Sequence, residues 1–216
     1  MSNHASGLAR FAHRIGRLKS TPRTGWLHRG VPPARTESVA DHSFRVAALA
    51  WLASSQVDGL NRDRIIKLAL LHDLAEVITG DFTPYDPESI GGLDPDQLRK
   101  ALNQRHVLSP ERKEAKRLAE NAAIDELAAD LAPSLADEVM TLWTELQKWE
   151  SPEARFVKEI DILETYLQSR EYLALDSGLP VASFAAEVAE AVTTPSLAAL
   201  RDAITAMTFD DSTEPG

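Results

Sequence analysis

Apolar residues recur along this chain at the three- and four-residue spacing of helices. In the stretch 68–81 (LALLHDLAEVITGD), leucine, valine and isoleucine surround His72 and Asp73 on nearly every side, which predicts a buried helix. No strict alternation of apolar and polar residues is long enough to predict a strand. We therefore predict an all-α fold, a single helical bundle, with helices at about 4–18, 38–55, 61–79, 94–105, 110–131, 133–149, 152–175, 181–192 and 195–207.

Helix starts carry clear local signals. Ser109, Ser151 and Thr194 each place a hydroxyl before a proline at the first helical position. Asn61 is a further expected cap, and Ser38 is expected to pair with Asp41 at the start of its helix. The segments 20–37 and 80–93 are rich in proline and glycine, so we expect structured loops there.

Length and composition narrow the class of protein. The 216 residues, 44% hydrophobic and 26% charged, fit one domain over 1–209 followed by a polar tail at 210–216. The net charge of −10 argues against binding of a nucleic-acid polymer or an anionic membrane surface, but allows a small phosphorylated substrate. There is no cysteine, no apolar run of membrane-spanning length and no secretory signal, so we expect a cytoplasmic protein.

Polar groups inside an apolar helix require partners, because an unpartnered buried polar group costs roughly 2–7 kcal/mol. His72 and Asp73 lie in such a helix, His42 lies on the preceding helix, and Asp161 flanks the apolar face of a later one. One divalent cation could join all four side chains, and mixed nitrogen and oxygen ligands suit Mn²⁺, Co²⁺, Fe²⁺ or Zn²⁺, with Mg²⁺ also open. A lone His-Asp pair is more often structural, so it is the ordered combination that favours a metal site.

The same residues carry a resemblance. The order His42, His72-Asp73, Asp161 matches the H…HD…D signature of the HD-domain metal-dependent phosphohydrolases. The segments LKSTPRTGW, ESVADHSFRVA, LALLHDLAEVITGD, SPEARFVKEIDILE and SREY resemble the 5′-deoxynucleotidase branch over residues 8–175. The resemblance implies that these four residues are metal ligands. It also implies a homodimer that releases phosphate from deoxynucleoside 5′-monophosphates.

Two acidic residues near the predicted metal site are candidate catalytic groups. Glu76 shares a helix face with His72 and is positioned to exchange a proton with water or the leaving oxygen; its bland alternative is a partner that orients a histidine. Asp81 follows the expected helix end, where a carboxylate gains nothing from the helix dipole. The resemblance implies an active-site role for Asp81, and a turn-forming residue is the alternative.

Three further residues are candidate substrate-binding groups. By resemblance, Arg23 in PRTGW clamps phosphate oxygens and Trp26 lines the sugar or base. We expect Lys158 to pair with a carboxylate near the site, with phosphate contact as the second possibility. Some bacterial relatives have an aromatic residue where this chain has Thr24, so discrimination between ribose and deoxyribose stays open.

Other segments have plainer interpretations. The stretch 87–108 is extra length relative to the family pattern, either a lid or an oligomer contact. His106 and the charged run 111–117 are expected on the solvated surface. The rival functions are another HD-type hydrolase acting on diesters, triphosphates or alarmones, a non-catalytic metal-bound binding module, and a helical scaffold without metal.

Overall fold

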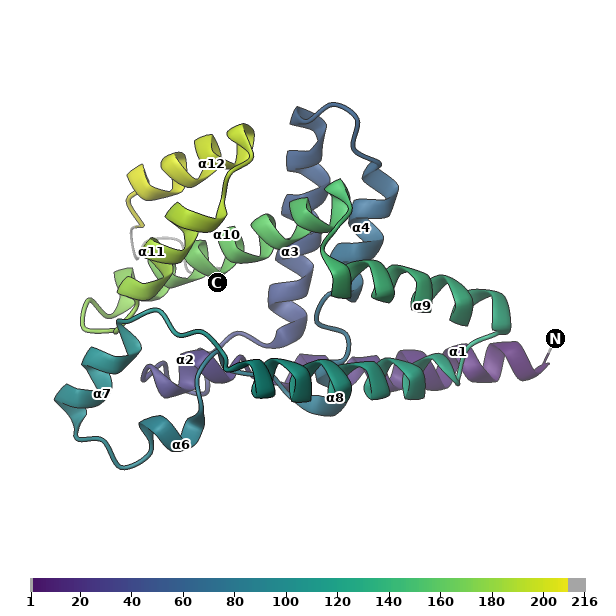
Figure 1. The fold of residues 1–216 in the computed structure, drawn as a ribbon, viewed down its shortest axis with the longest axis horizontal. Coiled ribbons are helices and arrows are strands. Elements are labelled where there is room, and N and C mark those ends of the chain that lie inside the picture. The colour runs from purple at the N-terminus through teal and green to yellow at the C-terminus, as the bar shows by residue number, and fades with distance from the viewer. Residues whose placement is uncertain (1, 210–216) are drawn as a thin grey trace.

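The protein is a helical bundle, seen in a computed structural model that describes residues 2–209 (Figure 1). The predicted all-α class is confirmed, since these residues contain no strand and only an isolated bridge between Pro22 and Ser38. The predicted tail at 210–216 lies outside the described residues. The helices are α1 (Ser2–Ile15), α2 (Thr24–His28), α3 (Val39–Ala53), α4 (Arg62–Leu71), α5 (Glu76–Thr79), α6 (Pro87–Ile90), α7 (Pro95–Leu102), α8 (Pro110–Ala128), α9 (Pro133–Lys148), α10 (Pro152–Leu175), α11 (Ala182–Ala191) and α12 (Pro195–Ala206), with 3₁₀ turns η1 (Gly16–Ser20) and η2 (Ser54–Gln56).

The core forms where α3, α4 and α10 contact one another (Figure 1). Their facing residues include Val46, Ile65, Leu68, Ile160 and Leu163, all of which are fully buried. Burying one such side chain contributes about 1.5–3 kcal/mol. These three helices therefore form a rigid base for polar groups at their edge.

The remaining helices surround this base. The α8–α9 pair packs against it through contacts of α9 with α4 and of α8 with α5, while α11 and α12 pack on α10. The extra stretch 87–108 carries α6 and α7 at one end of the molecule (Figure 1). Asn103 Oδ1 accepts a hydrogen bond from the Ala182 amide at 3.0 Å, so this stretch is attached to the start of α11. Within the described residues, no helix is both long and apolar enough to cross a membrane.

Most predicted helix caps are confirmed. Ser38 and Asp41 form a capping box on α3. Asn61, Ser109 and Ser151 each accept a hydrogen bond from a backbone amide in the first turn of their helices, which are α4, α8 and α10. The expected cap at Thr194 is wrong, because its hydroxyl makes no capping bond and its amide instead donates to Glu159 Oε2 at 2.9 Å.

The predicted helix 61–79 is interrupted. α4 ends at Leu71, and residues 72–75 form turns before the short α5. The imidazole Nδ1 of His72 bonds the Ala69 carbonyl at 2.7 Å, an oxygen that a regular helix would offer to residue 73. The segment is also less buried than expected, since Leu70 and Ile78 are exposed. His72 and Asp73 therefore project from a turn at the end of α4.

Candidate functional site

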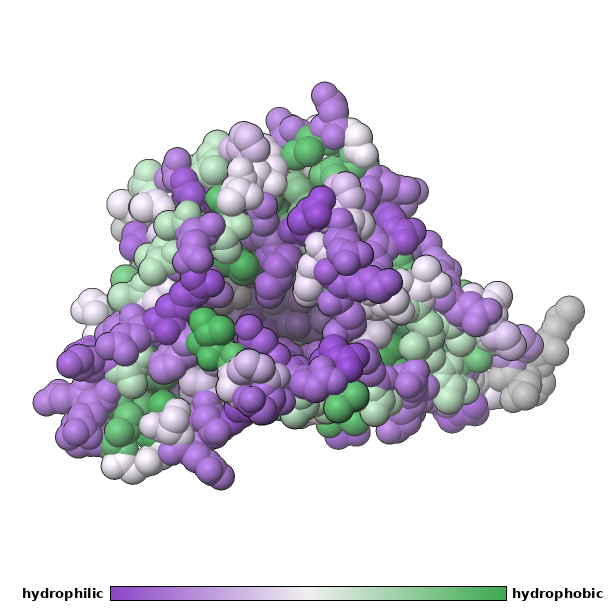
Figure 2. Space-filling view, viewed as in Figure 1, coloured by the Kyte–Doolittle hydropathy of each residue, from purple (hydrophilic) through white to green (hydrophobic). Residues whose placement is uncertain are grey.

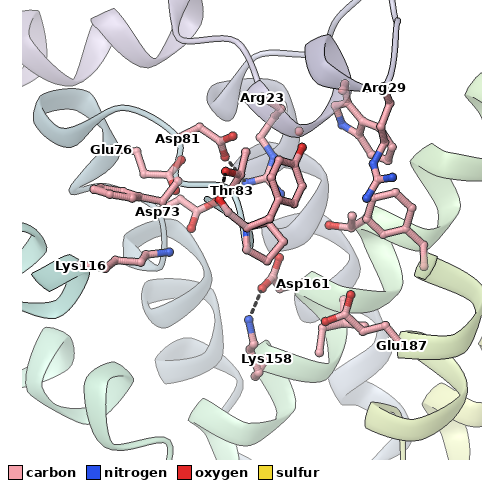
Figure 3. Close-up of a pocket in the computed structure, with 18 residues that line it drawn as sticks. Arg23, Arg29, Asp73, Glu76, Asp81, Thr83, Lys116, Lys158, Asp161 and Glu187 are labelled. Atoms are coloured by element: carbon pink, nitrogen blue, oxygen red, sulfur yellow. Dashed lines mark hydrogen bonds and ion pairs between the residues drawn. The ribbon is translucent and has the colours of Figure 1, made fainter. Parts of the chain in front are cut away.

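A cavity of about 220 Å³ opens beside the core helices. In Figure 2 a hollow lies near the middle of the face shown, with hydrophilic side chains around much of its rim. Its lining comes from the α2 segment, the residues around α5, and α8, α10 and α11. The charged residues that line it are Arg23, Arg29, Asp73, Glu76, Asp81, Lys116, Lys158, Asp161 and Glu187 (Figure 3).

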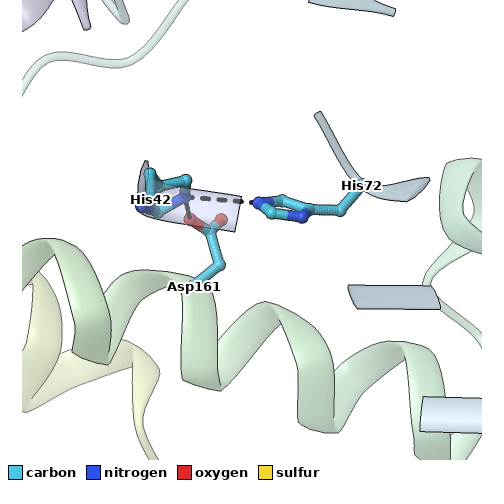
Figure 4. Close-up of side chains that lie close together, drawn as sticks. All are labelled: His42, His72 and Asp161. Carbon is cyan, nitrogen blue, oxygen red and sulfur yellow. Dashed lines mark hydrogen bonds and ion pairs between the residues drawn. The ribbon is translucent and has the colours of Figure 1, made fainter. Parts of the chain in front are cut away.

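Three of the four predicted metal ligands converge at the inner side of this cavity. His42 from α3, His72 after α4 and Asp161 from α10 point toward one another (Figure 4). The two imidazole Nε2 atoms are 3.3 Å apart, and Asp161 Oδ1 lies 3.2 Å from His42 Nε2. Side chains from three separate segments of the chain therefore form a possible metal site.

The hydrogen bonds of the two histidines leave both Nε2 atoms free to bind a cation. His72 Nδ1 faces the Ala69 carbonyl and His42 Nδ1 faces the Glu164 carboxylate, so both Nδ1 atoms act as donors. In the neutral rings, two Nε2 lone pairs then face each other beside a carboxylate. Histidine ligands of metals are oriented by hydrogen bonds of this kind.

Asp73, the fourth predicted ligand, lies beside the group formed by His42, His72 and Asp161, and its ligand role stays a prediction. Its Oδ2 atom lies 3.3 Å from His72 Nε2 and 3.6 Å from His42 Nε2. Two atoms that share a cation at about 2.1 Å, at angles of roughly 90–110°, are about 3.0–3.4 Å apart. His42 Nε2 lies 3.3 Å from His72 Nε2 and 3.2 Å from Asp161 Oδ1, within this range, so these three residues fit a divalent cation.

The charges of the site also favour a cation. Burial and the charge of Arg23 lower the pKa of His42, but hydrogen bonds to Asp161 and Glu164 outweigh them and raise it to about 10. Burial raises the pKa of Asp161, and Lys158 with the two histidines holds it well below its usual range. The pKa of Asp73 is lowered in the same way by His72, Arg23 and His42 against burial. Without a metal, Lys158, Arg23 and the protonated His42 ring keep both carboxylates ionised, and a bound cation would take the place of the proton on His42 Nε2.

Glu76 is the group with the most unusual environment. Its side chain is buried on α5, and Oε2 has no hydrogen-bond partner among the described residues. Burial, followed by the negative charges of Asp73 and Asp81, raises the pKa of Glu76 well above its usual value. This shift favours the protonated form of Glu76, which lines the cavity.

Arg23 and Asp81 hold each other at the cavity wall (Figure 3). Gly80 adopts a φ of 73°, which favours glycine and directs the chain so that Asp81 meets the start of α2. Asp81 Oδ2 accepts from the Thr24 amide at 2.7 Å, and Oδ1 accepts from Arg23 Nη1 at 3.1 Å. Arg23 Nη1 also donates to Asp73 at 3.1 Å, whereas Nε and Nη2 make no hydrogen bond to a described residue. Two donor positions of Arg23 thus remain for a ligand.

Trp26 is a buried wall residue. Its indole Nε1 donates to Glu37 Oε1 at 2.8 Å, and its ring packs against Tyr172 and Phe184 with centroid distances of 5.1 and 4.9 Å. Trp26 is among the residues that line the cavity, and its contact with the sugar or base stays a prediction. Because its N–H group is already engaged, the indole offers the cavity an apolar surface.

Two lysines line the cavity: Lys158 is paired as we predicted, and Lys116 is not where we predicted it. Lys158 Nζ donates to Asp161 Oδ2 at 2.9 Å, which is the pairing we expected. Lys116, in the run 111–117 that we placed on the solvated surface, instead lines the cavity. Its ammonium group lies 3.4 Å from Glu120 Oε1, and its positive charge lowers the pKa of Glu76. That part of the prediction is wrong, because α8 packs against α5 and turns this one lysine inward.

Two further residues, His106 and Arg29, lie near the cavity. His106 lies in the connection before α8, with Nε2 bonded to the Ala101 carbonyl at 2.8 Å and its ring 5.1 Å from that of Tyr85. The prediction of a solvated His106 is therefore wrong. Arg29 is buried and donates to the carbonyl groups of Leu102 and Pro180, so it supports the cavity wall.

Sequence reasoning missed the groups that support the site. Glu164 is fully buried three residues after Asp161, and besides His42 it binds Arg45 Nε at 2.7 Å. Arg45 Nη2 also donates a hydrogen bond to Gln168 Oε1 at 2.6 Å. A polar residue one helical turn from a predicted ligand, on the same face of α10, was the available signal.

Comparisons with known proteins give a consistent result. The HD domain family pattern matches residues 15–192. The 5′-deoxynucleotidase HDDC2 of Mus musculus is 37% identical over 176 residues, which cover 82% of this chain and 75% of that protein. The 5′-deoxynucleotidase hdd1 of Schizosaccharomyces pombe is 36% identical over 166 residues, covering 75% and 70%. A solved structure of a predicted metal-dependent phosphohydrolase from Magnetospirillum magnetotacticum, 22% identical, shares the fold with a TM-score of 0.64 over 94% of this chain and 91% of that one.

Proposed function

This chain belongs to the HD domain family, and on that premise we propose that it is a metal-dependent 5′-deoxynucleotidase. It converts a deoxynucleoside 5′-monophosphate and water into a deoxynucleoside and inorganic phosphate. The observation that carries the proposal is the pair of Nε2 atoms 3.3 Å apart, each on a ring whose Nδ1 is already bonded, next to the Asp161 carboxylate. The cluster opens on a cavity that has room for a small molecule.

The cation would be held by His42, His72, Asp73 and Asp161. When bound, it supplies positive charge to the phosphoryl oxygens and lowers the pKa of water. Nitrogen and oxygen donors of this kind accept Mn²⁺, Co²⁺, Fe²⁺, Zn²⁺ or Mg²⁺. The identity of the resident ion is decided by metal analysis of the purified protein.

The chain's own residues bind the phosphate and move the proton. Arg23 presents Nε and Nη2 to the phosphate oxygens, while Asp81 keeps its guanidinium in place. Lys116 adds a second positive charge to the cavity near Glu76, and Lys158 keeps Asp161 in position near the phosphate. Glu76, whose raised pKa favours the protonated form, would donate its proton to the leaving 5′ oxygen.

The test combines metal content with a substrate panel. The protein is assayed with Mn²⁺ or Co²⁺ against deoxynucleoside and ribonucleoside monophosphates, nucleoside triphosphates and cyclic nucleotides, which also tests the other HD-type hydrolases. His72→Ala should lose the metal and the phosphatase activity. The control is His13→Ala, an exposed histidine in the last turn of α1. If His72→Ala keeps both metal and activity, the proposal is wrong.

We also propose that the protein acts as a homodimer in the cytoplasm, on free nucleotides and not on a nucleic-acid polymer or a membrane. The solvent face of α3 supports a second copy, because Phe44, Trp51 and Leu52 are 75%, 49% and 58% exposed on this one helix. Exposed apolar groups that gather in this way are typical of contact surfaces. The net charge of −10 supports a small-molecule substrate.

A further inference from the structure

α11 brings a carboxylate into the cavity. Phe184 and Glu187 are three residues apart on this helix, so they share a face, and both line the cavity. In Figure 3 the Glu187 side chain enters from α11, on the other side of Asp161 from Glu76 and Asp81. α11 lies beyond the segment 8–175 on which the resemblance rests.

Glu187 is not used by the protein itself. Among the described residues no hydrogen bond to its carboxylate is present, although it is partly buried. Three cations feel its charge: Arg29, Lys158 and Arg105, and Arg105 is paired with Glu190. Arg29 donates to two carbonyl groups and to Ser183, while Lys158 donates to Asp161, so both have other partners. The carboxylate is therefore available to a ligand.

The charges give the cavity a direction. Arg23 and Lys116 lie around Glu76 and Asp73, where a phosphate group finds positive charge. Glu187 repels a phosphate and attracts N–H donors. A ligand with an anion at one end and donors at the other end fits this arrangement, and a nucleotide is such a ligand.

The wall next to Glu187 suits a flat ring. The Phe184 ring lies 4.9 Å from that of Trp26, and the guanidinium of Arg29 covers it at 4.5 Å. Ile162 and Tyr85 add apolar surface to the same cavity. Aromatic and apolar walls of this kind bind bases through stacking.

We propose that Glu187 is a specificity-determining residue that binds the Watson–Crick edge of guanine. Guanine presents two adjacent donors, N1–H and the 2-amino group, to which a carboxylate binds with two hydrogen bonds. Hypoxanthine lacks the amino group, and thymine offers a single N–H between two carbonyl oxygens that a carboxylate repels. The inference rests on the proposed function and names the preferred base among its substrates.

The first experiment measures binding without turnover. Deoxyguanosine and deoxyinosine, which have no phosphate to lose, are titrated calorimetrically into the metal-loaded protein. One hydrogen bond to a charged group is worth roughly 1.5–3 kcal/mol, so deoxyguanosine should bind about tenfold or more tightly. Glu187→Gln should bring the two dissociation constants within about threefold. The control Glu190→Gln, one turn further on α11 where Glu190 pairs with Arg105 outside the cavity, should keep the preference.

The second experiment measures kinetics. In Glu187→Gln the KM for dGMP should rise about tenfold, with kcat and the KM for dTMP unchanged. Equal binding of the two deoxynucleosides by the unaltered protein, or an equal change in KM for dGMP and dTMP in the variant, would overturn the inference. Preferential binding of deoxyguanosine without hydrolysis of any monophosphate would refute the proposed function alone. Hydrolysis without a base preference would refute the role of Glu187 alone.

Discussion

Replacing Glu164 with glutamine tests whether the support of His42 controls metal binding. Glu164 is fully buried and accepts from His42 Nδ1 and from Arg45 Nε at 2.7 Å. Glutamine has the same shape, but its single amide oxygen can serve only one donor well. Its NH₂ group then faces the other donor, so one of the two contacts is lost.

The size of the effect follows from these contacts. Loss of a partner that orients a metal-bound histidine typically costs 10–100-fold in metal affinity, or about 1.4–2.7 kcal/mol. Arg45 keeps its bonds to Gln168 and Glu171, so the fold should survive. In the absence of metal, we expect the free energy of unfolding of Glu164→Gln to be lower by about 1.5–3 kcal/mol, the worth of one hydrogen bond to a charged group.

The assay compares Glu164→Gln with Glu171→Gln. Both changes remove one carboxylate from Arg45, but Glu171 does not contact His42. Metal affinity is measured by competition with a fluorescent chelator, and stability by urea denaturation with EDTA present. Glu171→Gln should bind metal as the unaltered protein does. If the two variants bind metal equally well, Glu164 does not act through His42 and the reasoning fails.

Further predictions concern pH, phosphate binding, assembly and packing. Burial raises the pKa of Glu37 from 4.5 to about 7, so ionising Glu37 destabilises the folded state. This loss of stability is zero below about pH 4.5 and reaches its full size above about pH 7. In urea titrations, Glu37→Gln should therefore reduce the loss of unfolding free energy between pH 5 and pH 8 by up to about 3 kcal/mol. Lys116→Ala should raise the KM for the monophosphate about tenfold with an unchanged melting temperature, whereas Lys113→Ala, exposed on the same helix, should leave KM as it is. Phe44→Asp should yield monomers in light scattering if α3 forms the dimer contact. Leu163→Ala should lower the unfolding free energy by about 2–5 kcal/mol in chemical denaturation.

The sequence predicts well what is decided locally. The caps at Ser38, Asn61 and Ser109 depend on neighbouring residues, and the structure forms them as expected. The break after Leu71 was missed, because a side chain bond from His72 to the Ala69 carbonyl overrides an apolar pattern that fits a helix.

The site was predictable only in part, because side chain direction depends on how helices pack. His42, His72 and Asp161 could be grouped by order along the chain, and the structure brings them together. Lys116 lies in a run of charged residues without apolar spacing, so only the contact between α8 and α5 reveals that it turns inward. Glu187 likewise needed the packing of α11 on α10.

His42, His72 and Asp161 come from α3, the end of α4 and α10, so an ion bound among them cross-links distant parts of the chain. The chain contains no cysteine and therefore has no disulfide to do so. The bound ion closes one loop of 30 residues (72 − 42) and another of 89 (161 − 72). At a hundred times its dissociation constant, an ion that binds the folded state alone adds about 2.7 kcal/mol to stability. Removal of the ion by a chelator should thus lower the stability of the whole bundle as well as abolish its activity, so that metal supply would also control the lifetime of the folded protein.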